Sequence, residues 1–168
     1  IEFAKKNRTA MMDKVIHAVV MELDIDVAWY FKHIDIAHNY ARMEHHFGKD
    51  VMVHRKGACS AREGEIGIIP GSQGTASYIT KGKGNIHSFQ SCSHGAGRSM
   101  SRSKAKELLD LGTEQRLLDA QGIVHSVRTV SDLDEAPSSY KDIAEVMANQ
   151  TDLVDIETEL QPLAVVKG

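Results

Sequence analysis

The stretch between residues 50 and 92 constrains the fold most strongly, because short β-prone runs alternate there with glycines. Runs of this kind are typical of strands joined by tight turns. They predict strands at residues 51–53, 66–69, 77–80 and 88–91. The sequence therefore predicts a β-rich centre in which the strands form a mixed or antiparallel arrangement.

Helical patterns lie on both sides of this centre. Apolar side chains recur at steps of three and four residues between Phe3 and Leu23, which predicts an amphipathic helix whose methionines fill a core. Further helices are expected at residues 36–47, 99–111 and 137–150, and further strands at residues 123–130 and 164–166. We find no internal repeat or linker, so residues 1–168 are expected to form one α+β unit with flanking helices.

The charge balance excludes a general electrostatic attraction to nucleic acid, because 23 acidic residues outnumber 20 basic ones and the formal net charge is −3. A polyanion site must therefore be local. Basic residues cluster at 54–56 and again between Arg98 and Lys106, and acidic residues dominate after Asp132. The second basic cluster is also compatible with a solvated helix face.

Other bulk features favour a protein of the reducing cytoplasm. Cys59 and Cys92 are too few for a disulfide framework, and neither lies in a CxxC pair. No apolar run approaches the length that spans a membrane, and the first residues do not resemble a signal peptide. An initiator methionine is missing, so we expect the chain to begin inside a longer gene product.

A glycine-rich segment at residues 69–77 is the first candidate for ligand binding. Gly71 and Gly74 permit close approach of a ligand to the backbone. The nearby hydroxyls of Ser72 and Ser77 could surround a phosphate or the edge of a base. A tight turn between two strands explains the same glycines, so both interpretations stay open on these residues alone.

A second segment, at residues 91–98, combines a nucleophile with groups that bind anions. His94 precedes a turn that contains Gly97, and Arg98 and Arg102 follow it at the start of an expected helix. A neutral imidazole can attack phosphorus and hold the product as a phosphoramidate. The alternative is a histidine that only braces the turn.

Three histidines form the third candidate. His38 and His45 would lie two turns apart on one face of the helix expected at residues 36–47, with His46 beside them, and imidazole binds manganese, zinc or iron. Arg42 occupies the position four residues after His38, where a helical two-histidine site places its second ligand. A solvated surface therefore explains the last two histidines better than an unrelated metal hydrolase does.

Taken together, several segments closely resemble the RtcB family of RNA ligases. The matching stretches are residues 36–40, 54–58, 60–72, 81–85, 91–98, 140–143 and 166–168. They occur in order from near the start to the last residue, which is more specific than any one motif. The resemblance implies an RtcB-like fold and places residues 1–168 in the C-terminal part of the ligase catalytic domain.

The resemblance also implies an activity. Members of this family join RNA 3′-phosphate or 2′,3′-cyclic phosphate ends to 5′-hydroxyl ends, in tRNA splicing or RNA repair, using GTP, manganese and a guanylylated histidine. His94 matches that histidine, and His38 matches one manganese ligand. Arg55 and Arg98 are possible phosphate contacts. The residues that match nucleotide contacts are Pro70, Gly71, Ser72, Gln73, Ser77, Gly95, Ala96, Gly97, Tyr140 and Lys167.

The sequence departs from the family pattern in places. Gln73 stands where a methionine is expected, and residues 161–164 differ from the usual apolar approach to the terminus. The remaining metal ligands of the family, a cysteine, an aspartate and further histidines, match nothing here, and Cys59 and Cys92 are not that cysteine. The chain is therefore expected to be a fragment, half of a split ligase completed by another chain, or an inactive module that binds nucleotide or RNA. An activating protein is a further expected partner.

Overall fold

A computed structural model describes residues 2–25 and 34–166 and confirms the α+β class. The helices are α1 (Glu2–Leu23), α2 (Arg102–Leu108), α3 (Leu111–Ala120) and α4 (Ile143–Ala148), with 3₁₀ helices η2 (Ile86–Ser88), η3 (Val130–Glu135) and η4 (Pro137–Ser139). The strands are β1 (Asn39–His46), β2 (Lys49–Lys56), β3 (Ala58–Ser60), β4 (Ile66–Ile69), β5 (Ser77–Gly82), β6 (Ser91–Ser93) and β7 (Val154–Leu160).

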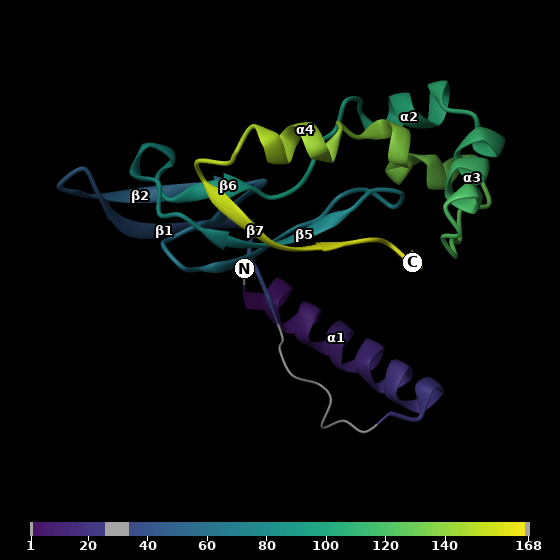
Figure 1. Cartoon of the computed structure of the whole chain (residues 1–168), viewed down its shortest axis with the longest axis horizontal. Helices are drawn as coiled ribbons and strands as arrows, with labels where there is room; N and C mark the ends of the chain where they lie inside the picture. Colours follow the sequence, from purple (N-terminus) through teal and green to yellow (C-terminus); the bar gives the residue numbers. More distant parts are fainter. Residues whose placement is uncertain (1, 26–33, 167–168) are drawn as a thin grey trace.

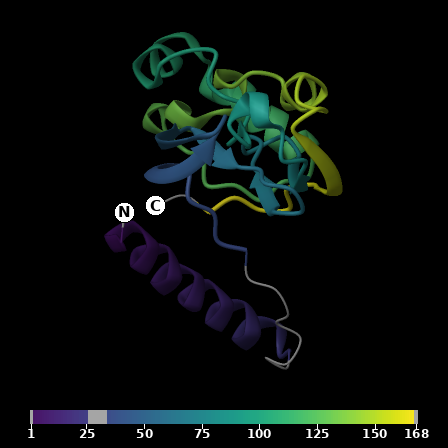
Figure 2. The same ribbon diagram turned by 90° about the vertical axis from the view of Figure 1, so that its left-hand side faces the viewer.

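The described strands form three small antiparallel sheets, with the orders β1–β2, β3–β6 and β4–β5–β7. Figure 1 shows these strands in the body of the molecule, with α2, α3 and α4 along one side. The long helix α1 lies on the opposite side, and Figure 2 shows it set apart from the strands. Among the described helices, none is both long and apolar enough to cross a bilayer.

Two clusters of buried side chains hold the body together. The larger forms where the short sheets meet α4, and it includes Ile69, Tyr78 and Met147. The smaller packs Leu118 of α3 against Ile123 and its neighbours. Burial of large apolar side chains contributes about 1.5–3 kcal/mol for each residue, so these clusters fix the strands relative to the helices.

The helix expected at residues 36–47 is wrong, because this segment contains a strand. β1 pairs along its whole length with β2, and Phe47 and Gly48 close the hairpin with φ values of +52° and +74°. A two-residue turn with positive φ matches the twist of an antiparallel pair. Near the end of β1, Glu44 and His46 are buried while the residue between them is exposed, which is the period-two burial of a strand.

The long N-terminal helix is confirmed, but its expected packing in a core is wrong. No described residue of α1 is buried, and Met11 and Met12 are 59% and 37% exposed. The apolar periodicity therefore predicts the helix correctly without showing what covers its apolar side chains.

The remaining expectations are confirmed in part. The strands expected at residues 51–53, 66–69 and 77–80 lie within β2, β4 and β5. Residues 88–91 mostly form a turn, since Phe89 and Gln90 have left-handed φ values and only Ser91 enters β6.

The strands expected at 123–130 and 164–166 reduce to one bridge between Val124 and Ala164, because the first segment packs its side chains against α3. The helices expected at 99–111 and 137–150 are shorter, as α2 and as η4 followed by α4, while α3 and β7 were not expected.

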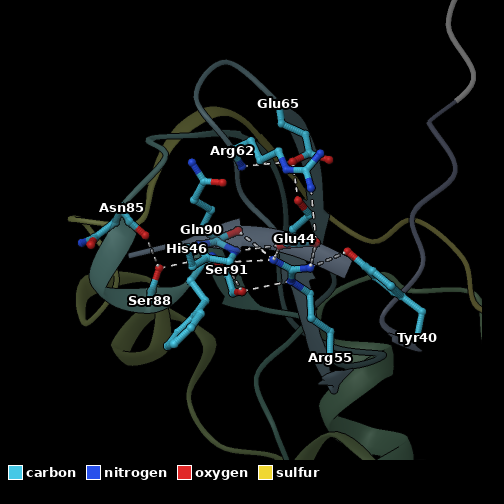
Figure 3. A network of polar contacts seen from close by, with 12 residues as sticks. Tyr40, Glu44, His46, Arg55, Arg62, Glu65, Asn85, Ser88, Gln90 and Ser91 are labelled. Carbon is cyan, nitrogen blue, oxygen red and sulfur yellow. Dashed lines mark hydrogen bonds and ion pairs between the residues drawn. The ribbon is translucent and has the colours of Figure 1, made fainter. Parts of the chain in front are cut away.

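A buried network around Arg55 ties the β1–β2 hairpin to the segment that enters β6 (Figure 3). Across the hairpin, Arg55 donates to Glu44 from Nη1 to Oε1 at 2.6 Å and from Nη2 to Oε2 at 3.0 Å. It also donates to the hydroxyls of Tyr40 and Ser91 and to the carbonyl oxygen of Phe89. The side chains of Arg55 and Glu44 are only 1% and 3% exposed. The hydrogen bonds from Arg55 lower the pKa of Glu44 to about 2.

Glu44→Gln is expected to destabilise the protein by about 3–5 kcal/mol at neutral pH, because it leaves the buried Arg55 charge without its partner. The pKa of Glu44 is lowered in the folded state, so its stabilisation is complete above the ordinary carboxyl pKa and is lost as the pH falls toward about 2. Urea unfolding of the wild type and the variant should therefore give free energies that converge as the pH falls from about 5 toward about 2.

The matched control is Asp50→Asn on the same hairpin, where the carboxylate is 77% exposed and pairs with His45. This change should alter the free energy of unfolding by less than about 0.5 kcal/mol. A Glu44→Gln difference that stays constant with pH would contradict the stabilising role of the Glu44 carboxylate.

Candidate active site

His38 and His94 meet face to face, with ring centroids 3.8 Å apart and 3° between the ring planes. His38 directly precedes β1, and His94 directly follows β6. Gly57, in the turn after β2, joins the two: its N–H donates to the His38 carbonyl oxygen at 3.0 Å, and its carbonyl oxygen accepts from the His94 N–H at 3.3 Å. Gly57 has a φ of +67°, a conformation that favours glycine, so this turn depends on that residue.

The stacked histidines line a cleft of about 1020 Å³. The predicted site residues that also line it are Pro70, Gly71, Gly95, Ala96, Gly97, Arg98 and Tyr140. Arg102, which the sequence placed beside His94 as a possible anion-binding group, lines it too, and so do Lys56 and Lys141, which were not among the predicted site residues. The sequence alone did not assign Lys56 and Lys141 to a site, because basic residues near a motif are also compatible with a solvated surface. Together these cations give the cleft a wall suited to phosphate.

The imidazole of His94 is partly buried beside a thiol. Its Nδ1 lies 3.4 Å from Sγ of Cys59. Burial, together with the neighbouring charge of His38, lowers the pKa of His94. Burial also raises the pKa of the Cys59 thiol to about 11. Both groups are therefore uncharged at neutral pH, and neutral imidazole is the form that can act as a nucleophile.

Arg98 and Tyr140 line the cleft as a stacked pair. The guanidinium carbon of Arg98 lies 4.9 Å from the Tyr140 ring centroid, and its Nη1 donates to the Tyr140 hydroxyl at 3.2 Å. Glu135 accepts from both side chains. Nη2 of Arg98 is buried and, within the described part of the chain, has no hydrogen-bond partner. A buried N–H without an acceptor is costly, so this atom could donate to a ligand.

The glycine-rich turn after β4 presents only its first residues to the cleft. Pro70 and Gly71 line the cleft, and the Ser77 hydroxyl accepts from the Gly71 N–H at 3.1 Å. Ser72 is bonded within the turn, and Oε1 of Gln73 is buried without a partner among the described residues. The segment connects β4 to β5 over residues 70–76, and a Cβ atom at Gly71 would collide with the carbonyl oxygen of Ala76. Ser72, Gln73 and Ser77 are not among the residues that line the cleft.

Of the remaining predicted contacts, Arg55 does not lie at the cleft. It points into the hairpin network, where Glu44 and Tyr40 occupy its guanidinium. Strand β2 directs this side chain into the interior, so we replace its expected contact with phosphate by a structural role. Lys167, the other predicted contact, lies outside the described residues.

His45 and His46 do not join His38 in a metal site. The first is exposed and bonds Asp50 at 2.8 Å. The second is buried against Glu44 at 2.9 Å, so its expected surface position is wrong. Over residues 2–25 and 34–166, no group of three or more His, Cys, Asp or Glu side chains could hold a metal ion. A metal hydrolase built on these three histidines is therefore not supported.

Comparisons with known proteins agree with the resemblance. The profile of the family described as tRNA-splicing ligase RtcB matches residues 1–168. The chain is 46% identical over 170 residues to the RNA-splicing ligase RtcB1 of Escherichia coli strain ATCC 25922, covering 99% of this chain and 41% of the relative. It is 45% identical to the RNA-splicing ligase RtcB of E. coli K12 with the same coverage. It is also 36% identical over 178 residues to the tRNA-splicing ligase RtcB of Nanoarchaeum equitans, covering 93% of this chain and 36% of the relative. The chain spans about two fifths of the length of the E. coli relatives, and it belongs to the RtcB family as a C-terminal portion of such a ligase.

Proposed function

We propose that this chain supplies the nucleotide-transfer centre of an RNA ligase, in which His94 takes GMP from GTP. The ligase would join RNA 3′-phosphate or 2′,3′-cyclic phosphate ends to 5′-hydroxyl ends, in tRNA splicing or RNA repair. The observation that carries the proposal is the position of the His94 imidazole, whose pKa is lowered by burial, in a cleft lined by basic side chains. Membership of a family of RNA-splicing ligases supports the same chemistry.

In the first step, Nε2 of His94 attacks the α-phosphorus of GTP. The N–P bond forms as the bond to the bridging oxygen breaks, and pyrophosphate leaves with the electron pair. An oxygen of the RNA 3′-phosphate then attacks the same phosphorus and frees His94. Attack by the 5′-hydroxyl on the activated RNA phosphate expels GMP and closes the phosphodiester. A 2′,3′-cyclic phosphate would be hydrolysed beforehand.

Different residues of the cleft would contact different parts of the nucleotide. Arg98, Lys56 and Lys141 offer positive charge to phosphate oxygens, since charge-assisted hydrogen bonds are the strongest available to such a ligand. Pro70 and Gly71 form a wall with the Gly95–Ala96–Gly97 loop, where small residues permit close approach of a ligand. Tyr140 offers its ring as a stacking surface, and Lys167 remains a predicted contact.

Manganese dependence is part of the proposal, with His38 as one ligand. The described residues do not by themselves fit a complete metal centre, because His38 has no set of carboxylates, thiols or imidazoles around it that could hold an ion. The other ligands would come from polypeptide corresponding to the part of the relatives that this chain does not cover. We therefore assign no chemical step to the metal here.

A split ligase, completed by a second chain, is the other candidate, and the exposed face of α1 favours it. A largely apolar groove of about 380 Å³ lies between α1 and the body, lined in part by Met11, Met12, Ile36 and Ile68, and it reaches His94. Exposed apolar surface of this kind is typical of an interface. A complementary segment seated there would lie beside the nucleophile.

Incubation with α-labelled GTP and manganese tests GMP transfer, on the chain alone and with the remaining portion of the E. coli K12 relative added. We expect label on the protein in at least the combined sample, and none with His94→Ala. The matched control is His125→Ala, which removes another largely buried histidine, one that bonds Asp119 outside the cleft. Label that needs the added portion shows that GMP transfer requires both portions, and no label in either sample would overturn the proposal.

Arg98→Lys should weaken GMP binding by about tenfold, because lysine keeps the charge but removes the unpartnered Nη2 donor. Titration calorimetry with GMP measures this loss, and circular dichroism checks that the fold is retained. Arg116→Lys is the control, since this arginine is 74% exposed on α3 and does not line the cleft. Equal affinity in both variants would remove Arg98 from the nucleotide site.

A further inference from the structure

Cys59 has a fixed position next to the candidate nucleophile. It is the middle residue of β3, it is 1% exposed, and it pairs directly with Cys92 of β6. The pairing of β3 with β6 fixes the backbone of Cys59, and close packing around the buried side chain restricts the thiol. Its Sγ lies 3.4 Å from Nδ1 of His94, within hydrogen-bonding distance for sulfur.

We propose that Cys59 is a positioning residue that selects the tautomer of His94, with its sulfur accepting a hydrogen bond from Nδ1–H so that Nε2 keeps its lone pair. In a neutral imidazole only one of the two ring nitrogens carries a proton. A hydrogen-bond acceptor beside one nitrogen favours the tautomer in which that nitrogen is protonated. The inference rests on the proposed function in one respect, that Nε2 is the atom that attacks phosphorus.

A thiol suits this task because it remains uncharged. A carboxylate at the same place would favour the protonated, positively charged imidazole, which has no lone pair left for attack. The Cys59 thiol, with its pKa raised by burial, holds the ring without adding charge. The imidazole N–H is also a better donor than the weak S–H, which favours the direction from Nδ1 to sulfur. Stacking on His38 then fixes the ring plane.

The test reads the tautomer directly, by long-range ¹H–¹⁵N spectra of histidine-labelled protein without nucleotide or metal, at a pH where the ring is neutral. The His94 signals are assigned with His94→Gln. We expect a protonated Nδ1 and an unprotonated Nε2 in the wild type. Cys59→Val, which removes the sulfur acceptor, should raise the share of Nε2–H.

Cys92→Val is the matched control, because it removes the other buried thiol of the same strand pair, and within the described residues the hydrogen bond to the His94 ring comes from Cys59 rather than from Cys92. The tautomer should be unchanged in this variant. If Cys59→Val fails to fold, Cys59→Ala gives the same prediction with a smaller side chain. A wild type with Nε2–H, or a Cys59→Val protein with the wild-type pattern, would overturn the inference.

Failure of this inference and failure of the proposed function are distinguishable. The expected tautomers without any GMP label would leave the positioning role standing and reject the ligase step. GMP label together with a His94 tautomer that is the same in the wild type and in Cys59→Val would support the ligase step and reject the positioning role of Cys59. Where transfer is measurable, Cys59→Val should lower kcat and leave KM for GTP unchanged, because it alters the nucleophile rather than the cleft wall.

Discussion

The buried ion pair between Arg55 and Glu44 connects the two segments on which the cleft depends. Glu44 lies in β1, whose start follows His38, and Arg55 also donates to Ser91 and the turn before β6, whose end precedes His94. Burying two charges is costly, and good geometry with several added hydrogen bonds is what offsets that cost. The network thus fixes β1 and the start of β6 relative to each other. The turn at Gly57 then hydrogen-bonds the backbones of His38 and His94, whose rings are in contact.

The sequence predicted much of the cleft because chemistry and order along the chain were informative. His94, Gly95 and Arg98 follow one another in a motif that becomes specific once the neighbouring motifs are present, and the structure places all three at the cleft. Pro70 and Tyr140 come from distant segments, and only the resemblance to a family could group them with His94. Periodicity alone would have left each of them as a turn residue or a surface aromatic.

The rest could not be predicted because it depends on pairing between distant residues. His38 and His45 have the spacing of a helix face, and only the pairing of β1 with β2 shows that this segment is a strand in which Glu44 is buried. β7 was missed although its apolar and charged residues alternate with the period of a strand, and after Val154 its side chains are exposed. The sequence also contains no indication that Cys59 contacts His94, because the two residues are brought together by the pairing of β3 with β6.

The central claim is that a cleft in this chain binds the nucleotide beside His94 even though the described residues hold no complete metal centre. The most direct measurement is a titration of ¹⁵N-labelled protein with GMP in the absence of metal, followed by backbone amide shifts. Saturable shifts are predicted at Gly71, Gly95 and Gly97, with little change along the exposed strand β7. Shifts that are absent at the cleft glycines, or that concentrate on β7 or α1, would contradict it.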